Sequence, residues 1–234
     1  MMAGPGIPRR RYRAALFDLD GTLVDTAPDL VRALNQTMDL EGLPRIKLDT
    51  VRNLIGRGSR VMIERAAALS GVTFRDERLD ALRDEFVTFY RADIARDSRP
   101  YPGVVDALDE LAALGAKFAV CTNKPTELSQ LLLDALDLSA RFSAIVGADS
   151  VAERKPNPDH YRAAVTRAGG IVRRSCMVGD TSIDVAAARG ADVPVAVVSF
   201  GYCDDSAERL GADVVLHRYS ELAPACRRLL AARP

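Results

Sequence analysis

Asp18 and Asp20 lie two positions apart, after an apolar run that begins at Ala14 and just before Gly21. Side chains at i and i+2 of a β-strand point to the same face, so both carboxylates would project together where the strand meets a glycine turn. Two like charges this close repel each other unless a cation or a shared proton compensates. The pair suits a divalent metal, nucleophilic attack and acid/base chemistry. The alternative is a surface turn, because Asp-Gly is a common turn dipeptide.

Polar side chains follow two more apolar, strand-like runs. One run ends in Thr122 and Asn123, whose hydroxyl and amide can donate to an anion, and Pro125 suits the first turn of a following helix. The alternative for this pair is helix capping. Lys155 follows the next run, in a loop that two prolines stiffen. A solvated surface charge is the alternative for this lysine.

Asp180 and Asp184 follow the fourth strand-like run. If a helix begins near Ser182, the two aspartates lie on adjacent turns that face the same opening, although capping and surface charge would also explain them. Four strand ends that carry these residue types predict a charge-balanced phosphate site. Carboxylates would hold a hard cation such as Mg²⁺. Phosphoryl oxygens would be bound by the donor set of Lys155, Thr122, Asn123 and turn amides such as that of Gly21.

The elements that position these residues alternate between strand and helix. Strands are expected at 14–18, 118–122, 144–147, 176–179 and 193–200, and helices at 104–114, 127–136, 161–168 and 183–188. This alternation predicts an α/β, Rossmann-like parallel sheet of about five or six strands with helices on both faces. Ligands of such sheets bind at the carboxyl ends of the strands, where the polar residues lie.

Residues 27–97 interrupt this alternation and are expected to be helical throughout. One face of a long amphipathic helix is marked by Leu79, Leu82, Phe86, Phe89, Tyr90 and Ile94. An all-helical block just after the first strand predicts an inserted cap domain at 27–97, with residues 14–26 and 98–234 forming the catalytic core. Residues 1–13, rich in Gly, Pro and Arg, are expected to be a flexible tail.

Composition narrows the functional classes. The chain has 234 residues, 48% of them hydrophobic, and its formal net charge is zero, so it gives no electrostatic footprint for nucleic acid or an anionic membrane. No apolar run approaches the ~20 residues of a membrane span. The four cysteines form no CxxC pair, which argues against a zinc site and favours a reducing, cytoplasmic compartment. A monomer or a homodimer is expected.

These motifs together resemble the haloacid dehalogenase superfamily, in its phosphatase branch with a helical cap after the first strand. The resemblance rests on DLDGT at 18–22, Thr122-Asn123, Lys155-Pro156 and GDTSID at 179–184, and it covers nearly the whole chain beyond the tail. The segment from Val51 to Gly58 is similar to the cap of phosphoglycolate phosphatases. An oxygen leaving group is implied by Asp20, because dehalogenases lack the second aspartate and phosphonatases replace it with a small residue.

The resemblance implies a two-step mechanism. Asp18 would attack phosphorus to form an aspartyl-phosphate, while Asp20 would protonate the leaving oxygen and then deprotonate water. Mg²⁺ would be held by the Asp18 carboxylate, the Asp20 main-chain carbonyl and Asp180. Asp184 would support the metal through water or orient Lys155.

The cap is expected to select the substrate, and there Arg57 and Arg60 could meet a substrate carboxylate. A solvated helix face is the alternative for both arginines. The first hypothesis is hydrolysis of 2-phosphoglycolate to glycolate and phosphate. The alternatives are another small-metabolite phosphatase, a pyrophosphatase, or a sugar-phosphate mutase that resembles β-phosphoglucomutase.

Overall fold

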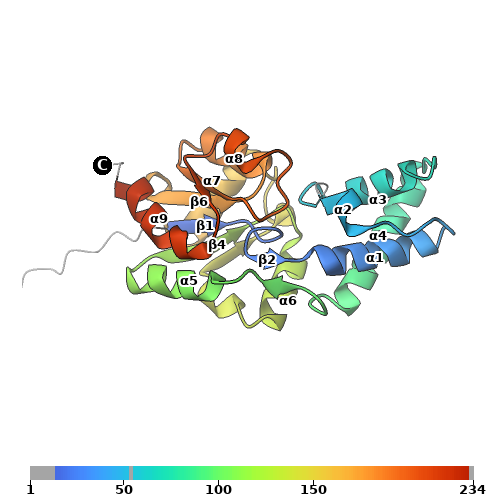
Figure 1. The fold of residues 1–234 in the computed structure, drawn as a ribbon, viewed down its shortest axis with the longest axis horizontal. Helices are drawn as coiled ribbons and strands as arrows, with labels where there is room; N and C mark the ends of the chain where they lie inside the picture. The colour runs from blue at the N-terminus through green and yellow to red at the C-terminus, as the bar shows by residue number, and fades with distance from the viewer. Residues whose placement is uncertain (1–13, 53–54, 232–234) are drawn as a thin grey trace, which may run out of the picture.

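The central element of the computed structural model, which describes residues 14–52 and 55–231, is a six-stranded sheet (Figure 1). Its order is β5-β4-β1-β6-β7-β8, and every pairing is parallel. The strands are β1 (Ala14–Phe17), β4 (Lys117–Cys121), β5 (Ala144–Val146), β6 (Ser175–Gly179), β7 (Val195–Val198) and β8 (Val214–Leu216). The predicted parallel sheet of five or six strands is confirmed, with β8 as the strand that the sequence pattern did not predict.

Helices cover both faces of the sheet. Alternate residues of β1 point to opposite faces, so Ala15 and Phe17 join one buried cluster while Ala14 and Leu16 join another. The first cluster lies under α5 (Val104–Ala113), α6 (Thr126–Ala135) and α9 (Leu222–Ala231). The second lies under α7 (Pro158–Arg167) and α8 (Ser182–Gly190). All four β1 residues are buried on both sides, which explains why this strand is an unbroken apolar run.

Short 3₁₀ segments complete the core, at Ser139–Arg141, Ala148–Ser150, Val172–Arg174, Ala207–Arg209 and Tyr219–Glu221. Each of β1, β4 and β6 ends at the same edge of the sheet, because the three strands are parallel and in register: Phe17 pairs with Val120 and with Val178. The residues that follow these strands are thereby brought side by side.

A block of helices lies at one end of the molecule, to the right in Figure 1. It consists of α1 (Ala27–Asp39), α2 (Leu48–Val51), α3 (Ser59–Ala68) and α4 (Asp76–Ala92). The chain enters it from β2 (Val24–Asp25) and leaves it into β3 (Arg99–Pro100), and these two short strands pair antiparallel. The block has its own buried cluster, to which the core contributes Leu128 and Tyr202. We propose residues 27–97 as a cap domain seated on the carboxyl edge of the sheet.

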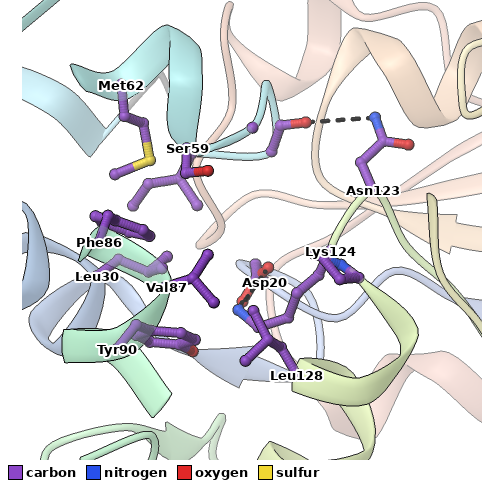
Figure 2. A pocket seen from close by; sticks show the side chains of 14 residues that line it. Asp20, Leu30, Ser59, Met62, Phe86, Val87, Tyr90, Asn123, Lys124 and Leu128 are labelled. Carbon is purple, nitrogen blue, oxygen red and sulfur yellow. Dashed lines mark hydrogen bonds and ion pairs between the residues drawn. The ribbon is translucent and has the colours of Figure 1, made fainter. Parts of the chain in front are cut away.

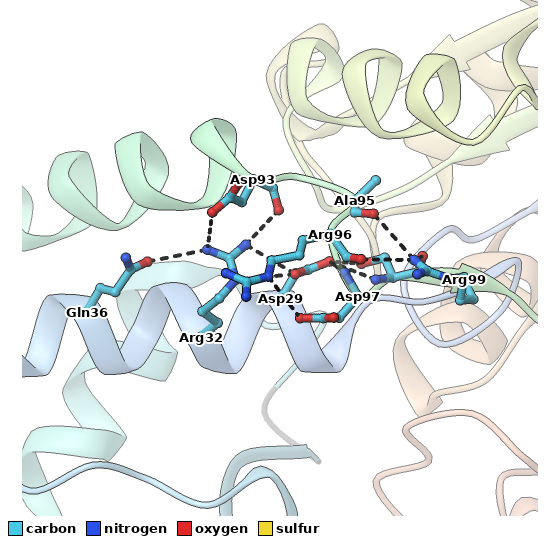
Figure 3. Close-up of polar contacts among 9 residues, drawn as sticks. Asp29, Arg32, Gln36, Asp93, Ala95, Arg96, Asp97 and Arg99 are labelled. Atoms are coloured by element: carbon cyan, nitrogen blue, oxygen red, sulfur yellow. Dashed lines mark hydrogen bonds and ion pairs between the residues drawn. The ribbon is translucent and has the colours of Figure 1, made fainter.

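A buried carboxylate ties the two crossings between core and cap together (Figure 3). Asp29, in the first turn of α1, accepts hydrogen bonds from the Ser98 amide at 2.8 Å, the Ser98 hydroxyl at 2.7 Å and the Asp97 amide at 3.0 Å. Arg32 lies 3.1 Å from Asp29 and donates to the Asp93 carbonyl at 2.6 Å. Burial raises the pKa of Asp29, but these hydrogen bonds outweigh burial and the pKa is lowered.

Two predicted features lie outside the described residues. They are the N-terminal tail at 1–13 and, within the cap segment 51–58, residues 53 and 54. Across the described ranges, no helix combines the length and the apolar composition that crossing a membrane requires.

Candidate active site

Three buried carboxylates meet at the carboxyl edge of the sheet. Asp18 follows β1, Asp180 follows β6, and Asp184 lies in the first turn of α8. One oxygen of each lies within 4.8 Å of the others. The pairing of β1 with β6 explains why Asp18 and Asp180 are neighbours. Asp184 lies about one helical turn after Asp180, which places the two carboxylates close together.

Lys155 is the cation that faces this cluster. Its ammonium lies 3.0 Å from Asp18 Oδ1 and 2.6 Å from Asp184 Oδ1, and its side chain is buried. Burial lowers the pKa of a lysine, but the Asp18 and Asp184 carboxylates more than offset that effect and raise the pKa of Lys155. The ammonium therefore stays charged, and it is one positive charge against three carboxylates.

The excess negative charge contributes to the raised pKa values of Asp18 and Asp180. Burial raises the pKa of Asp18 from 3.8 to about 6; Lys155 opposes the rise, while Asp184 and Asp20 add to it. Burial, with Asp184 and Asp18 next in importance, raises the pKa of Asp180 well above its usual range. A divalent cation with oxygen ligands fits this donor set, because it would supply the charge that Lys155 alone does not.

The Asp180 carboxylate is held at both oxygens. The Thr22 hydroxyl donates to Oδ1 at 2.8 Å, and the Tyr202 amide donates to Oδ2 at 2.7 Å. Gly21 has a φ of +84°, and a Cβ at this position would lie 2.3 Å from Asp180 Oδ2. The Asp-Gly turn of the sequence motif is therefore required by this close approach. Gly21's own amide donates to the Val24 carbonyl at 2.9 Å, so its predicted contact with phosphate stays a prediction.

Asp184 combines capping with a contact to Lys155. Its Oδ2 accepts from the Asp180 amide, the Thr181 amide and the Thr181 hydroxyl, at 3.2, 3.1 and 2.9 Å. Its Oδ1 faces Lys155. One Asp184 oxygen thus caps α8, and the other oxygen contacts Lys155. The hydrogen bonds of the helix N-cap fix the direction of the oxygen that contacts the lysine.

His160 fixes the backbone at Lys155. Its Nδ1 accepts from the Lys155 amide at 3.1 Å, and its Nε2 lies 3.0 Å from the Val146 carbonyl. This arrangement requires a neutral imidazole with the proton on Nε2, because only that tautomer accepts at one nitrogen and donates at the other. Burial is the main cause that lowers the pKa of His160 to about 4, which keeps the ring neutral.

Asp20 lines a cavity between core and cap (Figure 2). Its two oxygens lie 2.9 and 3.2 Å from the Lys124 ammonium. The two aspartates of the motif therefore have different partners: Asp18 pairs with Lys155 and Asp20 with Lys124. This separation allows one to attack while the other handles protons.

Thr122 and Asn123 lie beside these lysines. The Thr122 hydroxyl is buried and accepts from the Lys124 amide at 3.2 Å. The Asn123 amide nitrogen donates to the Lys155 carbonyl at 3.1 Å and to Gly56 of the cap at 3.4 Å. Asn123 thus links Lys155 to the cap. Direct contacts of Thr122 and Asn123 with phosphate stay predictions.

The two cap arginines that the sequence suggested do not line the cavity. Arg57 is half exposed and lies 3.7 Å from Asp204 of the core. Arg60 is bound within the cap by Asp76, Asp80 and Glu64. Their contact with a substrate carboxylate stays a prediction, and in this arrangement both arginines are paired with carboxylates of the protein.

Several residues around the site escaped sequence reasoning: Thr22, Tyr90, Lys124, His160 and Tyr202. Two of them had a local signal, since Thr22 belongs to the DLDGT motif and Lys124 directly follows Thr122-Asn123. Tyr90 and Tyr202 carry no local signal, because their partners come from distant parts of the chain. His160 contacts the nearby Lys155 amide, but no motif in the sequence marks it.

A parallel α/β sheet presents a paired aspartate, a buried lysine and two further aspartates at one edge, under a helical block. This arrangement is typical of hydrolases that act on phosphate esters. The polar groups match the needs of an anionic phosphoryl group and a hard cation.

Comparison with known proteins agrees with that class. The family model of the haloacid dehalogenase-like hydrolases matches residues 15–198. A phosphoglycolate phosphatase of Caulobacter vibrioides is 49% identical over 218 residues, which cover 93% of this chain and 92% of that protein. One from Agrobacterium fabrum is 46% identical over 211 residues, covering 90% and 91%. A crystal structure of a predicted phosphoglycolate phosphatase from Haemophilus somnus aligns with a TM-score of 0.86 at 28% identity, covering 93% and 99%. The chain therefore belongs to the haloacid dehalogenase-like hydrolases, and it is a phosphoric monoester hydrolase.

Proposed function

We propose that this enzyme hydrolyses 2-phosphoglycolate to glycolate and phosphate through an aspartyl-phosphate on Asp18. The observation that carries the chemistry is the division of the aspartate pair between two lysines, with Asp18 on Lys155 and Asp20 on Lys124. The substrate is supported by the 49% identity with the Caulobacter vibrioides phosphoglycolate phosphatase over nearly the whole of both chains.

In the first step an Asp18 carboxylate oxygen attacks phosphorus and the bond to the ester oxygen breaks. The departing oxygen takes the proton of the Asp20 carboxyl group. In the second step Asp20 accepts a proton from water, the water oxygen attacks phosphorus, and the bond to Asp18 breaks to release phosphate. Lys155 stabilises the charge on the transferring phosphoryl group, and the buried hydroxyl of Thr122, at the end of β4, is a second donor for it.

The carboxylates of Asp18 and Asp180, with the main-chain carbonyl of Asp20, would hold Mg²⁺, and Asp184 would lie behind them as a supporting residue. When bound, the ion would neutralise charge on the phosphoryl oxygens and on the carboxylates. The hydrogen bonds from Thr22 and Tyr202 hold the Asp180 carboxylate in a fixed orientation, in which it could bind the ion. The raised pKa values of Asp18 and Asp180 are the observation that favours a cation here.

Phosphate release from a panel of esters tests this function. The panel contains 2-phosphoglycolate, p-nitrophenyl phosphate, pyrophosphate and β-glucose 1-phosphate, each with and without Mg²⁺. We expect the highest kcat/KM for 2-phosphoglycolate, and loss of turnover in Asp18→Asn and in EDTA. Full activity of Asp18→Asn would exclude the covalent intermediate. A low rank for 2-phosphoglycolate would exclude the substrate, and glucose 6-phosphate formed from β-glucose 1-phosphate would indicate a mutase.

A further inference from the structure

The cavity between core and cap has a mostly apolar lining, which includes Leu30, Ile55, Met62, Phe86, Val87 and Leu128. Its polar side chains are those of Asp20, Ser59, Tyr90, Asn123 and Lys124. Among the described residues that line it, Lys124 is the one cationic side chain. The cavity measures about 70 Å³, several times the minimum that one water molecule requires, so it accepts a group of a few heavy atoms.

Lys124 is held at the edge of this cavity by contacts on two sides. Its side chain is only 5% exposed, and a buried ammonium is costly unless it is paired. The Asp20 carboxylate lies on one side, and the Tyr90 ring lies on the other with its centroid 4.4 Å from Nζ. The lysine is therefore positioned by core and cap together, since Tyr90 belongs to α4.

A second donor faces the same place. Tyr90 is 1% exposed and lines the cavity, and its hydroxyl has no hydrogen-bond partner among the described residues. Figure 2 shows the Tyr90 ring directed toward the Asp20–Lys124 pair. A buried hydroxyl without a partner costs free energy, and an acceptor on a bound ligand would remove that cost.

We propose that Lys124, with the Tyr90 hydroxyl, binds a carboxylate that the substrate carries on the carbon next to its ester oxygen. The short distance between Asp20 and Lys124 is the reason. Asp20 must contact the leaving oxygen, and the Lys124 ammonium is one hydrogen bond away from Asp20. A carboxylate one carbon beyond the leaving oxygen would meet the ammonium and the hydroxyl at once. This inference deepens the proposed function and rests on it, and it assigns to Lys124 the contact that sequence reasoning gave to Arg57 and Arg60.

The test compares two esters that differ in the carboxylate. We would measure kcat/KM for 2-phosphoglycolate and for ethyl phosphate in the wild type, Lys124→Met, Tyr90→Phe and, as a matched control, Lys47→Met. Lys47 is an exposed cap lysine just before α2. The preference for 2-phosphoglycolate should fall about 10- to 100-fold in Lys124→Met and by a smaller factor in Tyr90→Phe, and it should be unchanged in the control.

Equal losses on both esters in Lys124→Met would overturn the proposal, because they would show that Lys124 acts through Asp20 alone. Should Lys124→Met fail to fold, Tyr90→Phe decides, since it removes a hydroxyl that accepts or donates no hydrogen bond within residues 14–52 and 55–231. An unchanged ester preference in Tyr90→Phe would then overturn the joint binding site.

Inhibition by glycolate separates this inference from the proposed substrate. Glycolate and the uncharged ethylene glycol would be compared as competitive inhibitors of p-nitrophenyl phosphate hydrolysis. The proposal expects glycolate to bind more tightly than ethylene glycol in the wild type, and this difference to vanish in Lys124→Met, whichever ester the enzyme prefers. A difference that persists in Lys124→Met would overturn it.

Discussion

The Lys155 ammonium lies 2.6 Å from Asp184 Oδ1, although Lys155 comes from the loop before α7 and Asp184 from the first turn of α8. Both groups are buried, and the other Asp184 oxygen is occupied by the amides and hydroxyl of the α8 cap. The hydrogen bonds at the N-terminus of α8 therefore orient the Asp184 carboxylate toward Lys155, and the Lys155 ammonium lies 3.0 Å from Asp18. The local structure of α8 in this way determines the position of the ammonium beside Asp18.

Replacing Lys155 by methionine tests this relationship. We expect kcat for p-nitrophenyl phosphate to fall by about 10²–10³, the usual effect of removing one preorganised charge at a transition state. The metal-free protein should also lose about 3–5 kcal/mol of unfolding free energy, because buried carboxylates would keep no cation. Kinetics and urea unfolding measure the two effects. Lys47→Met, an exposed lysine, should change neither, and a Lys155→Met protein of wild-type activity would refute the assignment.

The response to Mg²⁺ should depend on pH. The pKa of Asp18 is raised from 3.8 to about 6 in the folded protein, so the metal-free fold holds a proton that the unfolded chain releases. The contribution of Asp18 to stability is thus complete below about pH 4 and is lost as the pH rises through 6. A bound cation must displace that proton at pH 5 but not at pH 7.5, which weakens apparent binding at pH 5 about tenfold for this one proton.

Thermal melts with and without Mg²⁺ at the two pH values measure this linkage. We expect a larger increase in Tm at pH 7.5 than at pH 5, and a smaller pH dependence in Asp18→Asn. An increase of equal size at both pH values would show that binding of the cation does not displace the Asp18 proton.

The parallel sheet and the meeting of its strand ends were predictable from sequence, because a buried parallel strand is a continuous apolar run and its carboxyl end is marked by the first polar residue. Asp18, Asp180, Asp184 and Lys155 lie together for that reason. The expected helix marked by Leu79 and Phe86 exists as α4, since its apolar period is regular over four turns.

What escaped prediction depends on distant packing. Lys124 follows a strand end, where a lysine is ordinarily solvated, and it is buried because Tyr90 of the cap covers it. His160 lies in a polar-looking helical segment, and its partners are the Lys155 amide in the preceding loop and the carbonyl of Val146, the last residue of β5. The strand Val24–Asp25 has two residues and is too short for a periodic pattern to emerge.

His160 should make stability depend on acidity. Its pKa is lowered from 6.5 to about 4, so the unfolded chain binds a proton between these values that the folded protein does not. Its contribution is therefore present above pH 6.5 and is lost as the pH falls toward 4, by about 3 kcal/mol. The unfolding free energies of the wild type and His160→Gln, compared from pH 7 to pH 4.5, should converge as the pH falls. Parallel curves would mean that the imidazole does not titrate with unfolding.

The same variant tests the positioning of Lys155. Loss of the Nδ1 acceptor frees the Lys155 amide without removing the ammonium. We therefore expect kcat to fall by about tenfold with a small change in KM, because the lysine would be placed less well for the transition state than for binding. A change in KM alone would contradict this role.

Asp29 should hold the entry and exit of the cap together. In Asp29→Asn the single remaining oxygen cannot serve all of the donors from Asp97, Ser98 and Arg32, and a charge-assisted hydrogen bond is worth about 1.5–3 kcal/mol. We expect a loss of that size in urea unfolding at pH 7. Because the pKa of Asp29 is lowered in the fold, the difference from the wild type should shrink as the pH falls below about 4.

Asp39→Asn is the matched control: Asp39 ends the same helix in an exposed pair with Arg45, and its loss should cost under about 0.5 kcal/mol. Equal effects of the two substitutions would show that the buried hinge carboxylate contributes no more than a surface charge.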